Sequence, residues 1–532
     1  MINKLRKVKR WYHQYGFKLL IRKILDRQEE DSVDYINWKK RNEADKHELE
    51  RQSKEKFFDD ITISIAVPVY HTPKKYLCEM IESVCRQTYS QWELCIADGS
   101  NDERLYDYIS KYAKQDQRIK IQKLERNLGI AGNTNAAVSM CIGAYIGFLD
   151  HDDTLAPEAL YQIRDAIQRN QYPDILYTDE DKMSMNGEKF YDPHFKSDYN
   201  KELLRSNNYI CHFFVTKKDI IDQVGGFRKK YEGAQDYDFI LRCTEVAENI
   251  VHIAKPLYHW RCHAESTAEN PESKLYAYRN GKKAIEAHLK RQGESGCVQY
   301  TKDMGFYHVK YKLLKSDKVT IIIFDNDRIS NKDVSKCIKS IKQTIGYSYY
   351  DIFSLKSLSE FDDKNISGDY VLFINSTVSL ITYNWMTELL GYCQKKDTGA
   401  VGIKLYNRNE TIRHAGIIAN MKGYAFEGMP RVRSGYFHRD SMSQNLNAVS
   451  IDFMMIPSSL LIDLRRTDCN ILYNERRLCE KIRNKGKKII YNPFVEAYIK
   501  GSSSRVACYS EKKDEFYNEN FELVSPGYRI IS

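Results

Sequence analysis

Short apolar runs alternate with stretches of helical spacing over residues 61 to 150. The runs ISIAVPVY, WELCIAD, IKIQKL and AYIGFLD are rich in β-branched residues, a pattern that predicts strands. The intervening stretches KYLCEMIESVCR and GNTNAAVSMC have the spacing of helices. Strands that alternate with helices predict a parallel, doubly wound α/β sheet, in which ligands bind at the carboxyl ends of the strands.

The same alternation of predicted strands and helices begins again at KVTIIIFDND. The pair Gln-Thr at 87–88 recurs at 343–344, and GAYIGFLD at 143–150 corresponds to GDYVLFIN at 368–375. Repetition on this scale indicates an internal duplication with a divergent second copy. The length of 532 residues exceeds what one hydrophobic core normally organises, which agrees with two domains in tandem.

The boundary between the copies is expected near residues 295 to 316, after the helix-like stretch KKAIEAHLKRQG and its glycine-rich stop. Residues 26–58 are dense in charge with few apolar anchors, which predicts a charged helix that serves as a connector. The expected parts are a helical extension (1–58), a first α/β domain (59–295), a second α/β domain (317–510) and a C-terminal tail (511–532).

Most of the net charge of +10 lies at the start of the chain. Residues 1–25 hold eight Lys or Arg and no acidic residue, interleaved with aromatic and aliphatic side chains. This mixture suits an anionic membrane surface, and a basic helix that rests in solvent on its own protein is an equal alternative. Because the basic charge is terminal and no base-reading motif accompanies it, nucleic-acid binding is disfavoured.

Membrane-spanning and disulfide-rich classes have no support. No apolar stretch approaches the roughly 18 to 20 residues that cross a bilayer. The 13 cysteines are odd in number and scattered without CxxC pairs, which disfavours a disulfide framework or a zinc site. We expect a cytoplasmic protein, with the basic start as its contact to the inner face of the plasma membrane.

The sharpest local motif is LDHDD, which places three carboxylates after an apolar strand. Asp150, Asp152 and Asp153 would raise one another's pKa unless a cation or hydrogen-bond donors compensate. Mg²⁺ or Mn²⁺ held by one or two carboxylates takes its other ligands from water and substrate phosphates, so the motif also predicts a phosphate-bearing ligand. The alternative is an acidic N-terminus of a helix that begins after Thr154.

Two upstream loops also follow predicted strands. Asp98 in ADGSND could accept hydrogen bonds from a base or a ribose, and the Gly-Asn stretch at 125–135 lets backbone approach a ligand closely. Each loop taken alone is also ordinary turn chemistry. The chain has no GxGxxG and no GxxxxGK[ST], so dinucleotide and P-loop binding have no support.

Downstream motifs supply a candidate base and further ligands. Asp236 and Asp238 begin a predicted helix in EGAQDYDFILR, where a carboxylate could take a proton from an acceptor hydroxyl. In YHWRCH, His259 and His263 could complete a metal shell and Arg261 could face phosphate. The alternatives are an acid that stabilises a helix N-terminus and histidines that make structural hydrogen bonds.

These motifs together resemble one enzyme family. From residue 63 to about 293 the chain resembles the family 2 glycosyltransferases with the A-type, nucleotide-diphospho-sugar fold, and in particular bacterial enzymes that build rhamnose-containing or O-antigen-type polysaccharides. The resemblance rests on the order and spacing of SIAVPVY, ADGSN, NLGIAGNTNAA, GAYIGFLDHDD, LYTDEDK, FKSDYNKELLRSNNYI, GGFR, EGAQDYDFILR and LYHWRCHAEST.

The resemblance implies an inverting transfer of a sugar, with Mn²⁺ or Mg²⁺ as cofactor. The donor would be a UDP- or dTDP-linked sugar, rhamnose among the candidates, and the acceptor a growing cell-surface glycan or lipid-linked glycan. Ala97 departs from the acid that many members carry beside the equivalent of Asp98, which leaves the nucleotide open. Two other readings stay open: a two-site polymerase that uses both copies, and a non-catalytic carbohydrate-binding scaffold.

The resemblance also implies roles for individual residues. Asp236 would be the catalytic base. The donor would be bound by Pro68, Tyr70, Asp98, Asn127, Gly132, Asn135 and Asp150. The metal would be held by Asp150, Asp152 and His263, with His259 as a substitute. The acceptor side and the layer behind the site would hold Asp153, Asp179, Gln235, His259, Trp260 and Arg261.

The second copy lacks these groups and is expected not to transfer sugar. Where Asp150, His151, Asp152 and Asp153 stand in the first copy, it has Asn375, Ser376, Thr377 and Val378. Glu475 matches Asp236 but is followed by Arg476 and Arg477, and YIKGSS replaces YHWRCH. We expect this copy to pack on the first domain or to hold acceptor chain, near His414 and Arg431 to Arg433.

Overall fold

The computed structural model describes residues 34–262, 275–325, 330–501 and 513–531. The basic segment 1–25 and His263, for which the sequence made predictions, lie outside these ranges. None of the helices within them is long and apolar enough to cross a bilayer.

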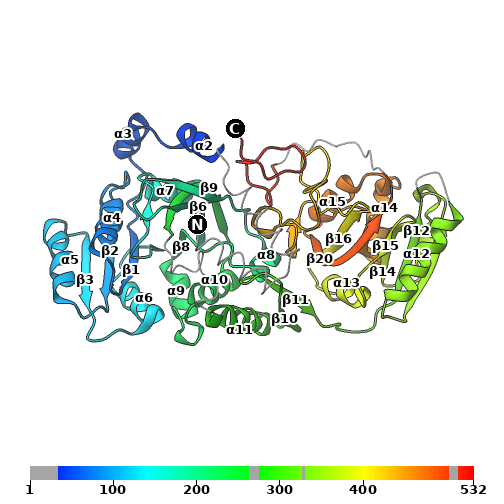
Figure 1. The fold of residues 1–532 in the computed structure, drawn as a ribbon, viewed down its shortest axis with the longest axis horizontal. Coiled ribbons are helices and arrows are strands. Elements are labelled where there is room, and N and C mark those ends of the chain that lie inside the picture. The colour runs from blue at the N-terminus through cyan, green and yellow to red at the C-terminus, as the bar shows by residue number, and fades with distance from the viewer. Residues whose placement is uncertain (1–33, 263–274, 326–329, 502–512, 532) are drawn as a thin grey trace, which may run out of the picture.

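A nine-stranded sheet organises the first half of the chain (Figure 1). Its order is β3-β2-β1-β4-β8-β6-β9-β5, with β7 paired to β6. Every residue of β1 and β2 is buried, as expected for parallel strands covered by helices on both faces. The strands are β1 (Ile63–Val69), β2 (Trp92–Asp98), β3 (Ile119–Lys123), β4 (Tyr145–Phe148), β5 (Thr154–Leu155), β6 (Ile175–Met183), β7 (Phe190–His194), β8 (Phe214–Lys217) and β9 (Ile250–Arg261).

Helices join these strands in the alternation that the sequence predicted. They are α4 (Lys74–Cys85), α5 (Glu103–Gln115), α6 (Gly129–Ser139), α7 (Ala159–Arg169), α8 (Lys201–Ser206), α9 (Lys218–Val224), α10 (Gln235–Val246) and α11 (Leu275–Arg291). After α11 a small hairpin leads to the second half; its strands are β10 (Gly296–Tyr300) and β11 (Tyr307–Tyr311).

The second half contains another nine-stranded sheet, in the order β13-β12-β14-β19-β16-β20-β15, with β17 on β16 and β18 on β20. Its strands are β12 (Val319–Phe324), β13 (Tyr350–Leu355), β14 (Tyr370–Asn375), β15 (Ser379–Leu380), β16 (Thr398–Asn407), β17 (Ile412–His414), β18 (Gln444–Leu446), β19 (Phe453–Pro457) and β20 (Lys488–Ile499). Its helices are α12 (Asn331–Thr344), α13 (Trp385–Cys393), α14 (Ser458–Thr467) and α15 (Glu475–Asn484).

Six strand pairings of the first sheet recur in the second sheet. The pairs β1·β2, β1·β4 and β6·β9 are parallel, and so are β12·β13, β12·β14 and β16·β20. The antiparallel pairs β4·β8, β6·β8 and β5·β9 recur as β14·β19, β16·β19 and β15·β20. The predicted internal duplication of α/β domains is thus confirmed.

The described part of the charged N-terminal segment, from residue 34 on, forms two helices where the sequence predicted one connecting helix. They are α2 (Asp34–Asn42) and α3 (Lys46–Lys54). The break has a local cause, because the side chain of Asp45 accepts the backbone N–H of Glu48 and so caps α3. Helix α2 is also more than a connector: Tyr35 and Trp38 are buried against Phe195.

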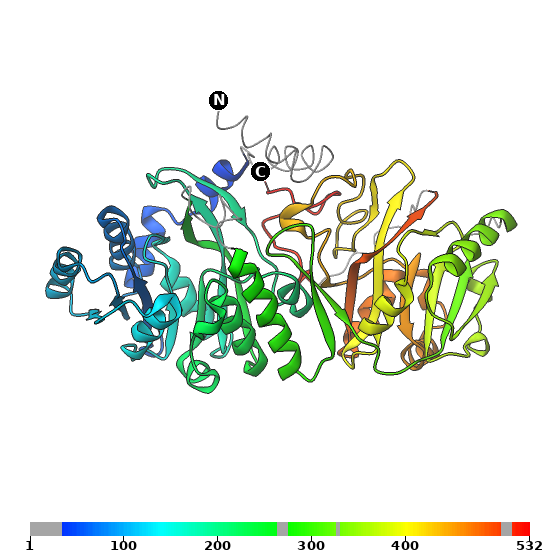
Figure 2. The same cartoon turned by 60° about the horizontal axis from the view of Figure 1, so that its bottom comes forward.

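The two halves lie side by side along the long axis of the molecule, and the C-terminal segment 513–531 lies at their junction (Figures 1 and 2). Phe521 from this segment contacts the rings of Phe195 from the first half and Tyr436 from the second. One continuous set of buried apolar side chains extends through both sheets. The halves therefore share a core as well as a surface.

Candidate active site

Three carboxylates follow β4, and one of them is built into the fold. Asp153 is buried; its Oδ2 accepts the hydroxyl of Tyr258 at 2.5 Å and its Oδ1 accepts the backbone N–H of Arg261 at 2.7 Å. Burial, reinforced by the charges of Asp152 and Asp150, raises the pKa of Asp153 well above its usual range. Asp153 therefore fixes the turn against β9, and Asp150 and Asp152 are the partly exposed members of the motif.

Asp150 and Asp152 fit a hard divalent cation. Two partly exposed carboxylates on one turn leave negative charge that a cation would neutralise. Such a cation would take its remaining ligands from water and substrate phosphate. The third predicted protein ligand, His263, lies outside the described residues.

One cluster elsewhere has the geometry of a metal site. Among the described residues, the group of possible ligand atoms within 4.8 Å of one another is Glu93, Cys95 and Cys141, all buried. The Glu93 carboxylate already accepts the Ser64 hydroxyl and pairs with Lys120 at 2.5 Å. Its charge is satisfied within the protein, so this cluster reads as structural.

Strand β9 carries the largest corrections to the sequence predictions. Successive side chains of a strand point to opposite faces, so Tyr258 reaches Asp153 while His259 points the other way. There the Nδ1 of His259 lies 2.6 Å from Asp181, a carboxylate that also accepts the hydroxyl of Tyr35. His259 thus is not placed to substitute in the metal shell; it makes a structural hydrogen bond.

Arg261 is not free to face a phosphate either. Its side chain is buried, and its Nε donates to the backbone oxygen of Asp152 at 2.7 Å. The two terminal nitrogens bind the backbone oxygen of Met185 and the carboxylate of Glu79. The guanidinium instead fixes the backbone of the carboxylate motif from behind.

Asp236 stands in the first turn of α10 and is partly exposed. Its Oδ2 accepts the side-chain N–H of Asn208 at 2.9 Å, and the thiol of Cys211 lies 3.9 Å away. Desolvation raises the pKa of Asp236, the charge of His212 opposes this, and the charge of Asp150 raises it further. The backbone N–H of Asp150 donates to the hydroxyl of Tyr258 at 3.3 Å, and the ring of His212, next to Cys211, stacks on Tyr258. Asp150 and Asp236, far apart in sequence, therefore border one site.

The neighbours of Asp236 in α10 have structural roles. Asp238 is buried and pairs with Arg228 and with Arg242, the latter at 3.0 Å. Gln235 accepts the backbone N–H of Gly233 at 2.7 Å and so closes the turn before the helix. Of the two acids that the sequence offered as a base, Asp236 is the one that remains available.

Segment 207–213, between α8 and β8, lines the site and was not among the predicted residues. It supplies Asn208 and Cys211 beside Asp236. The ring of His212 stacks on Tyr258 with centroids 4.6 Å apart and lies 6.3 Å from the ring of Trp260. The sequence signals were the stretch FKSDYNKELLRSNNYI, which is part of the resemblance and ends at Ile210, and the polar run SNNYICH directly before an apolar strand.

The donor-side residues gather at the carboxyl ends of neighbouring strands. Asp98 ends β2, is buried, and accepts the backbone N–H of Ser100 at 2.9 Å. Strand register sets Pro68 and Val69 beside Ala97 and Asp98. Tyr70 follows β1 and is 46% exposed. Since β4 pairs with the other edge of β1, Asp150 emerges at the same end of the sheet.

The predicted Gly-Asn donor loop is stabilised by its own side chains. Asn127 accepts the N–H of Gly129 at 2.9 Å and the side-chain N–H of Asn133 at 3.0 Å. Asn135 bonds both the N–H and the carbonyl of Phe227, each at 2.8 Å. At Gly132 a Cβ would lie 2.5 Å from the Cβ of Leu128. The amide of Asn135 is therefore committed to the protein instead of to a donor.

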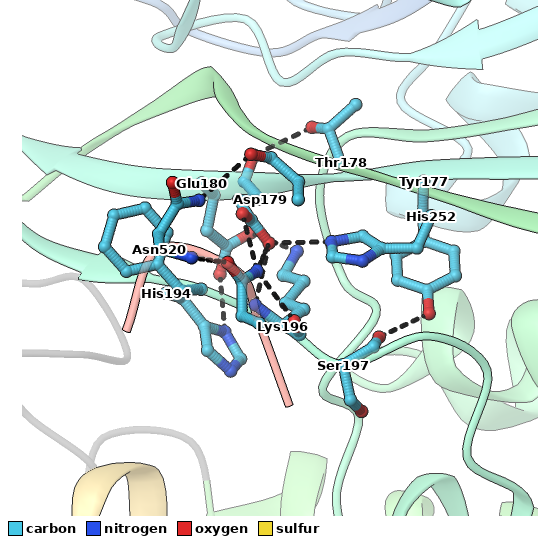
Figure 3. A network of polar contacts seen from close by, with 12 residues as sticks. Tyr177, Thr178, Asp179, Glu180, His194, Lys196, Ser197, His252 and Asn520 are labelled. Atoms are coloured by element: carbon cyan, nitrogen blue, oxygen red, sulfur yellow. Dashed lines mark hydrogen bonds and ion pairs between the residues drawn. The ribbon is translucent and has the colours of Figure 1, made fainter. Parts of the chain in front are cut away.

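Asp179 was predicted for the acceptor side or for the layer behind the site, and its contacts are with protein groups. It is fully buried, and its carboxylate accepts the backbone N–H of Lys196 at 2.7 Å and the Nε2–H of His252 at 2.8 Å (Figure 3). It also accepts the side-chain N–H of Asn518 at 3.0 Å. Asp179 thus ties the C-terminal segment to the first half.

In the second half, side chains of the protein itself occupy the equivalent site. Asn375, in the place of Asp150, donates to Asp452 at 3.0 Å. Glu475, in the place of Asp236, is buried and accepts hydrogen bonds from Tyr424 at 2.9 Å, from Ser450 at 3.0 Å and from the backbone N–H of Ile451 at 2.9 Å. Two acids remain at this strand end, Asp452 and Asp325, and they accept hydrogen bonds from the side chains of Asn375 and Ser376, each at 3.0 Å.

Strand register corrects one alignment of the two copies. Leu155 pairs with Tyr258 in the first sheet, and Leu380 pairs with Ala497 in the second. Tyr498 therefore corresponds to His259. The comparison of YHWRCH with YIKGSS had instead matched Tyr498 to Tyr258.

The predicted acceptor contacts of the second half are occupied within the protein. His414 is buried, bonds the backbone at Ile403 and Ser450, and has its pKa lowered to about 4 by burial. Arg431 pairs with Glu496 at 2.8 Å. These contacts argue against an acceptor at His414.

Comparison with known proteins places this site in a family. Residues 64–225 match the family described as glycosyl transferase family 2. The chain is 33% identical over 487 residues to the uncharacterized protein y4gI of Sinorhizobium fredii, which covers 83% of this chain and 53% of that protein. It is 30% identical over 407 residues to the O-antigen biosynthesis protein RfbC of Myxococcus xanthus (70% and 32% covered). It is 31% identical over 207 residues to the chondroitin synthase of Escherichia coli (39% and 30% covered).

The chain spans about half or less of the length of these relatives. The family match begins in β1 and ends directly after α9. It thus includes the strand ends that carry Asp98 and Asp150, together with the turn that carries Asp152. The matched segment of the first half, residues 64–225, is therefore a family 2 glycosyltransferase domain.

Proposed function

We propose that the chain transfers a sugar from a nucleotide-diphospho-sugar to a glycan acceptor, with one working site in its first half. The observation that carries the proposal is the meeting of two carboxylate groups from different elements. Asp150 and Asp152 lie after β4, and Asp236 stands in the first turn of α10. The backbone N–H of Asp150 donates to Tyr258, the ring of Tyr258 stacks on His212, and the neighbouring Cys211 contacts Asp236. A site for a charged diphosphate and a site for a base are thereby adjacent.

The residues have distinct tasks in this proposal. Asp150 and Asp152 would hold a divalent cation, which would neutralise the negative charge that develops on the leaving diphosphate. Asp98 would accept hydrogen bonds from the nucleoside. Asp236 would remove the proton from the acceptor hydroxyl, and because it acts on the face opposite the leaving group, one displacement would invert the anomeric centre.

The raised pKa of Asp236 supports its role as the base. A carboxylate with a higher pKa is a stronger base and remains ionised at neutral pH as long as the shift is moderate. Partial exposure leaves the carboxylate accessible, and Asn208 fixes its orientation. Asp153 and Asp238, the other acids close by, are buried and committed to protein donors.

The comparisons suggest the class of acceptor. Relatives that match this chain over at least 207 residues are described as an O-antigen biosynthesis protein and a chondroitin synthase. We infer that the acceptor is a polysaccharide or a lipid-linked precursor of one, and that the donor is a UDP- or dTDP-linked sugar.

The second half is proposed to be a non-transferring copy. Its Glu475 already accepts three hydrogen bonds, and Asn375 replaces the first carboxylate of the motif. This contrast favours a single-site transferase over a two-site polymerase. The partly exposed acids of the first half favour an enzyme over a carbohydrate-binding scaffold.

A screen of sugar nucleotides tests the proposal. Purified full-length protein would be incubated with each donor and Mn²⁺ or Mg²⁺, and release of the nucleotide would be measured with and without glycan acceptors. We expect metal-dependent release from one donor and its loss in Asp236→Asn. The matched control is Asp222→Asn, a surface acid of α9 that pairs only with Lys218. Absence of release from every donor would contradict the proposal.

A further inference from the structure

Lys196 is an ammonium group enclosed in the first half, next to but not among the acidic residues of the site. Its side chain is fully buried. The three protons of Nζ have three acceptors: the carboxylate of Glu180 at 3.3 Å, the carbonyl of Ile210 at 2.7 Å and the carbonyl of His212. A buried charge is tolerated only when it is paired and hydrogen-bonded in this way, so the arrangement fixes all of its partners.

Two of these partners belong to segment 207–213, which lines Asp236. Lys196 holds the segment by the carbonyls of Ile210 and His212, and Glu180 holds it by the backbone N–H of His212 at 3.2 Å. Burial would raise the pKa of Glu180, but Lys196 and His194 lower it to about 2, so Glu180 is ionised. Lys196 and Glu180 together therefore bind carbonyl groups and a backbone N–H of the same short segment.

This stretch needs external support. Cys211 has a φ of +35°, a backbone conformation that residues other than glycine rarely adopt and that the surrounding structure must hold in place. The same segment delivers Asn208 to the carboxylate of Asp236 at 2.9 Å. A shift of the segment would therefore move the hydrogen bond that orients Asp236.

We propose that Lys196 is a positioning residue for the transfer reaction: its ammonium fixes segment 207–213 and so holds Asp236 in the orientation that proton removal requires. The inference rests on the proposed function of Asp236. A displacement of about 1 Å in a reacting group can lower a rate by on the order of 10²-fold. Lys196 acts through this segment, because its ammonium binds Glu180, Ile210 and His212 and not Asp236 itself.

The C-terminal segment supports Lys196 from the other side. The backbone N–H of Lys196 donates to Asp179, and its carbonyl accepts the side-chain N–H of Asn518 at 2.8 Å. Asn518 also donates to Asp179 at 3.0 Å. Figure 3 shows Asp179, Glu180 and Lys196 close to His252 and to the backbone of the C-terminal segment. The C-terminal segment is thus connected to segment 207–213 through Lys196.

A charge-neutral double variant tests the proposal. Lys196→Met with Glu180→Gln removes the ammonium and its carboxylate together, so no unpaired buried charge is left. The matched control is Lys404→Met with Asp440→Asn, which removes the buried pair of the second half, 2.5 Å apart. We expect the first variant to lower kcat for transfer by about 10- to 100-fold with the dissociation constant of the donor unchanged. The control should lose comparable thermal stability and keep its kcat.

The single variant Asn518→Ala provides a second test should the double variant not fold. It removes the support of the Lys196 carbonyl, and kcat should fall several-fold at unchanged donor affinity. Its control is Asn520→Ala, which removes a 3.0 Å hydrogen bond to Ala254 from the same segment. Equal kcat in Asn518→Ala and Asn520→Ala, or an equal loss in the two charge-pair variants, would overturn the proposal.

The proposed function can fail separately. If Asp236→Asn transfers sugar as well as the wild type does, the role of Asp236 is wrong and the role of Lys196 falls with it. If Asp236→Asn is inactive while the Lys196 and Asn518 variants keep full kcat, only the positioning role is wrong.

Discussion

Partners within the protein decide which acidic side chains of the first half can take part in catalysis. Asp153 accepts two hydrogen bonds from β9, and Asp238 pairs with two arginines. Asp150, Asp152 and Asp236 stay partly exposed. The sequence offered all of these acids as candidates, but it could not separate the members that hold the fold from those that face solvent, because the difference lies in long-range contacts.

Asp236→Asn should lower kcat by ~10²- to 10⁴-fold while the donor still binds, because the amide keeps the shape and loses the base. Steady-state kinetics and isothermal titration with the donor would measure the two effects. A variant that lost donor affinity and kept its rate would place Asp236 on the donor side.

The pH dependence of kcat should report the same group. Transfer requires ionised Asp236, and desolvation together with Asp150 raises its pKa. The rate should therefore fall as the pH is lowered through a value above the usual ~3.9 of an aspartate. An acidic limb at or below that value in wild-type protein would contradict the raised pKa.

Asp152→Ala should remove the metal dependence of donor binding and abolish turnover without unfolding the protein. Asp152 is partly exposed and lies on a turn, so its loss creates no cavity in the core. Donor titrations with and without Mn²⁺ and a thermal melt would be compared with those of Asp222→Asn. Undiminished transfer by Asp152→Ala would contradict the metal assignment.

At the scale of elements, hydrophobic alternation predicted the parallel strands and their helices because buried strands and amphipathic helices leave plain periodicities. The hydrophobic pattern did not predict side-chain directions that depend on the register of paired strands. Strand β6 pairs with β9 through irregularities at Thr178, Asp179 and Glu180, and a shift of one residue reverses which face a side chain takes. For this reason the direction of His259 and the alignment of Tyr498 could not be predicted from the sequence.

Helix α2 shows a second limit of pattern reading, because its apolar residues pack on parts of the chain far away in sequence. Trp38→Ala should lower the free energy of unfolding by ~3 kcal/mol or more, since the ring is buried with its centroid 5.0 Å from that of Phe195. Ile36→Ala, on the exposed side of the same helix at 55% exposure, should change it by less than about 0.5 kcal/mol. Urea unfolding would measure both, and equal effects would show that α2 is not part of the core.

At the scale of the whole molecule, an ion cluster joins the two halves. Glu202 in α8 pairs with Arg205 at 3.1 Å and with Lys395 of the second half at 2.5 Å. Glu294 pairs with Arg205 at 2.8 Å and with Lys395 at 3.2 Å. The sequence predicted two domains in tandem, but it could not predict this cluster, because each partner is an ordinary charged residue in its own segment.

The cluster makes stability depend on pH. Burial would raise the pKa of Glu202, but Lys395 and Arg205 lower it to about 2. A lowered folded-state pKa adds stability that is present above the unfolded value of ~4.3 and is lost as the pH falls toward 2. Unfolding measured at pH 7, 5 and 3 should show this loss between pH 5 and pH 3 in the wild type and a smaller loss in Glu202→Gln. Identical pH profiles would contradict the shift.

The central claim is that one site, in the first half, performs all transfer. The most direct measurement compares full-length wild type, Asp150→Ala with Asp152→Ala, and Glu475→Gln for metal-dependent sugar transfer over a panel of donors. The account predicts transfer by the wild type and by Glu475→Gln, and none by the double variant. Metal-dependent transfer that persists in the double variant and disappears when Glu475 is also replaced would show a second working site and contradict the account.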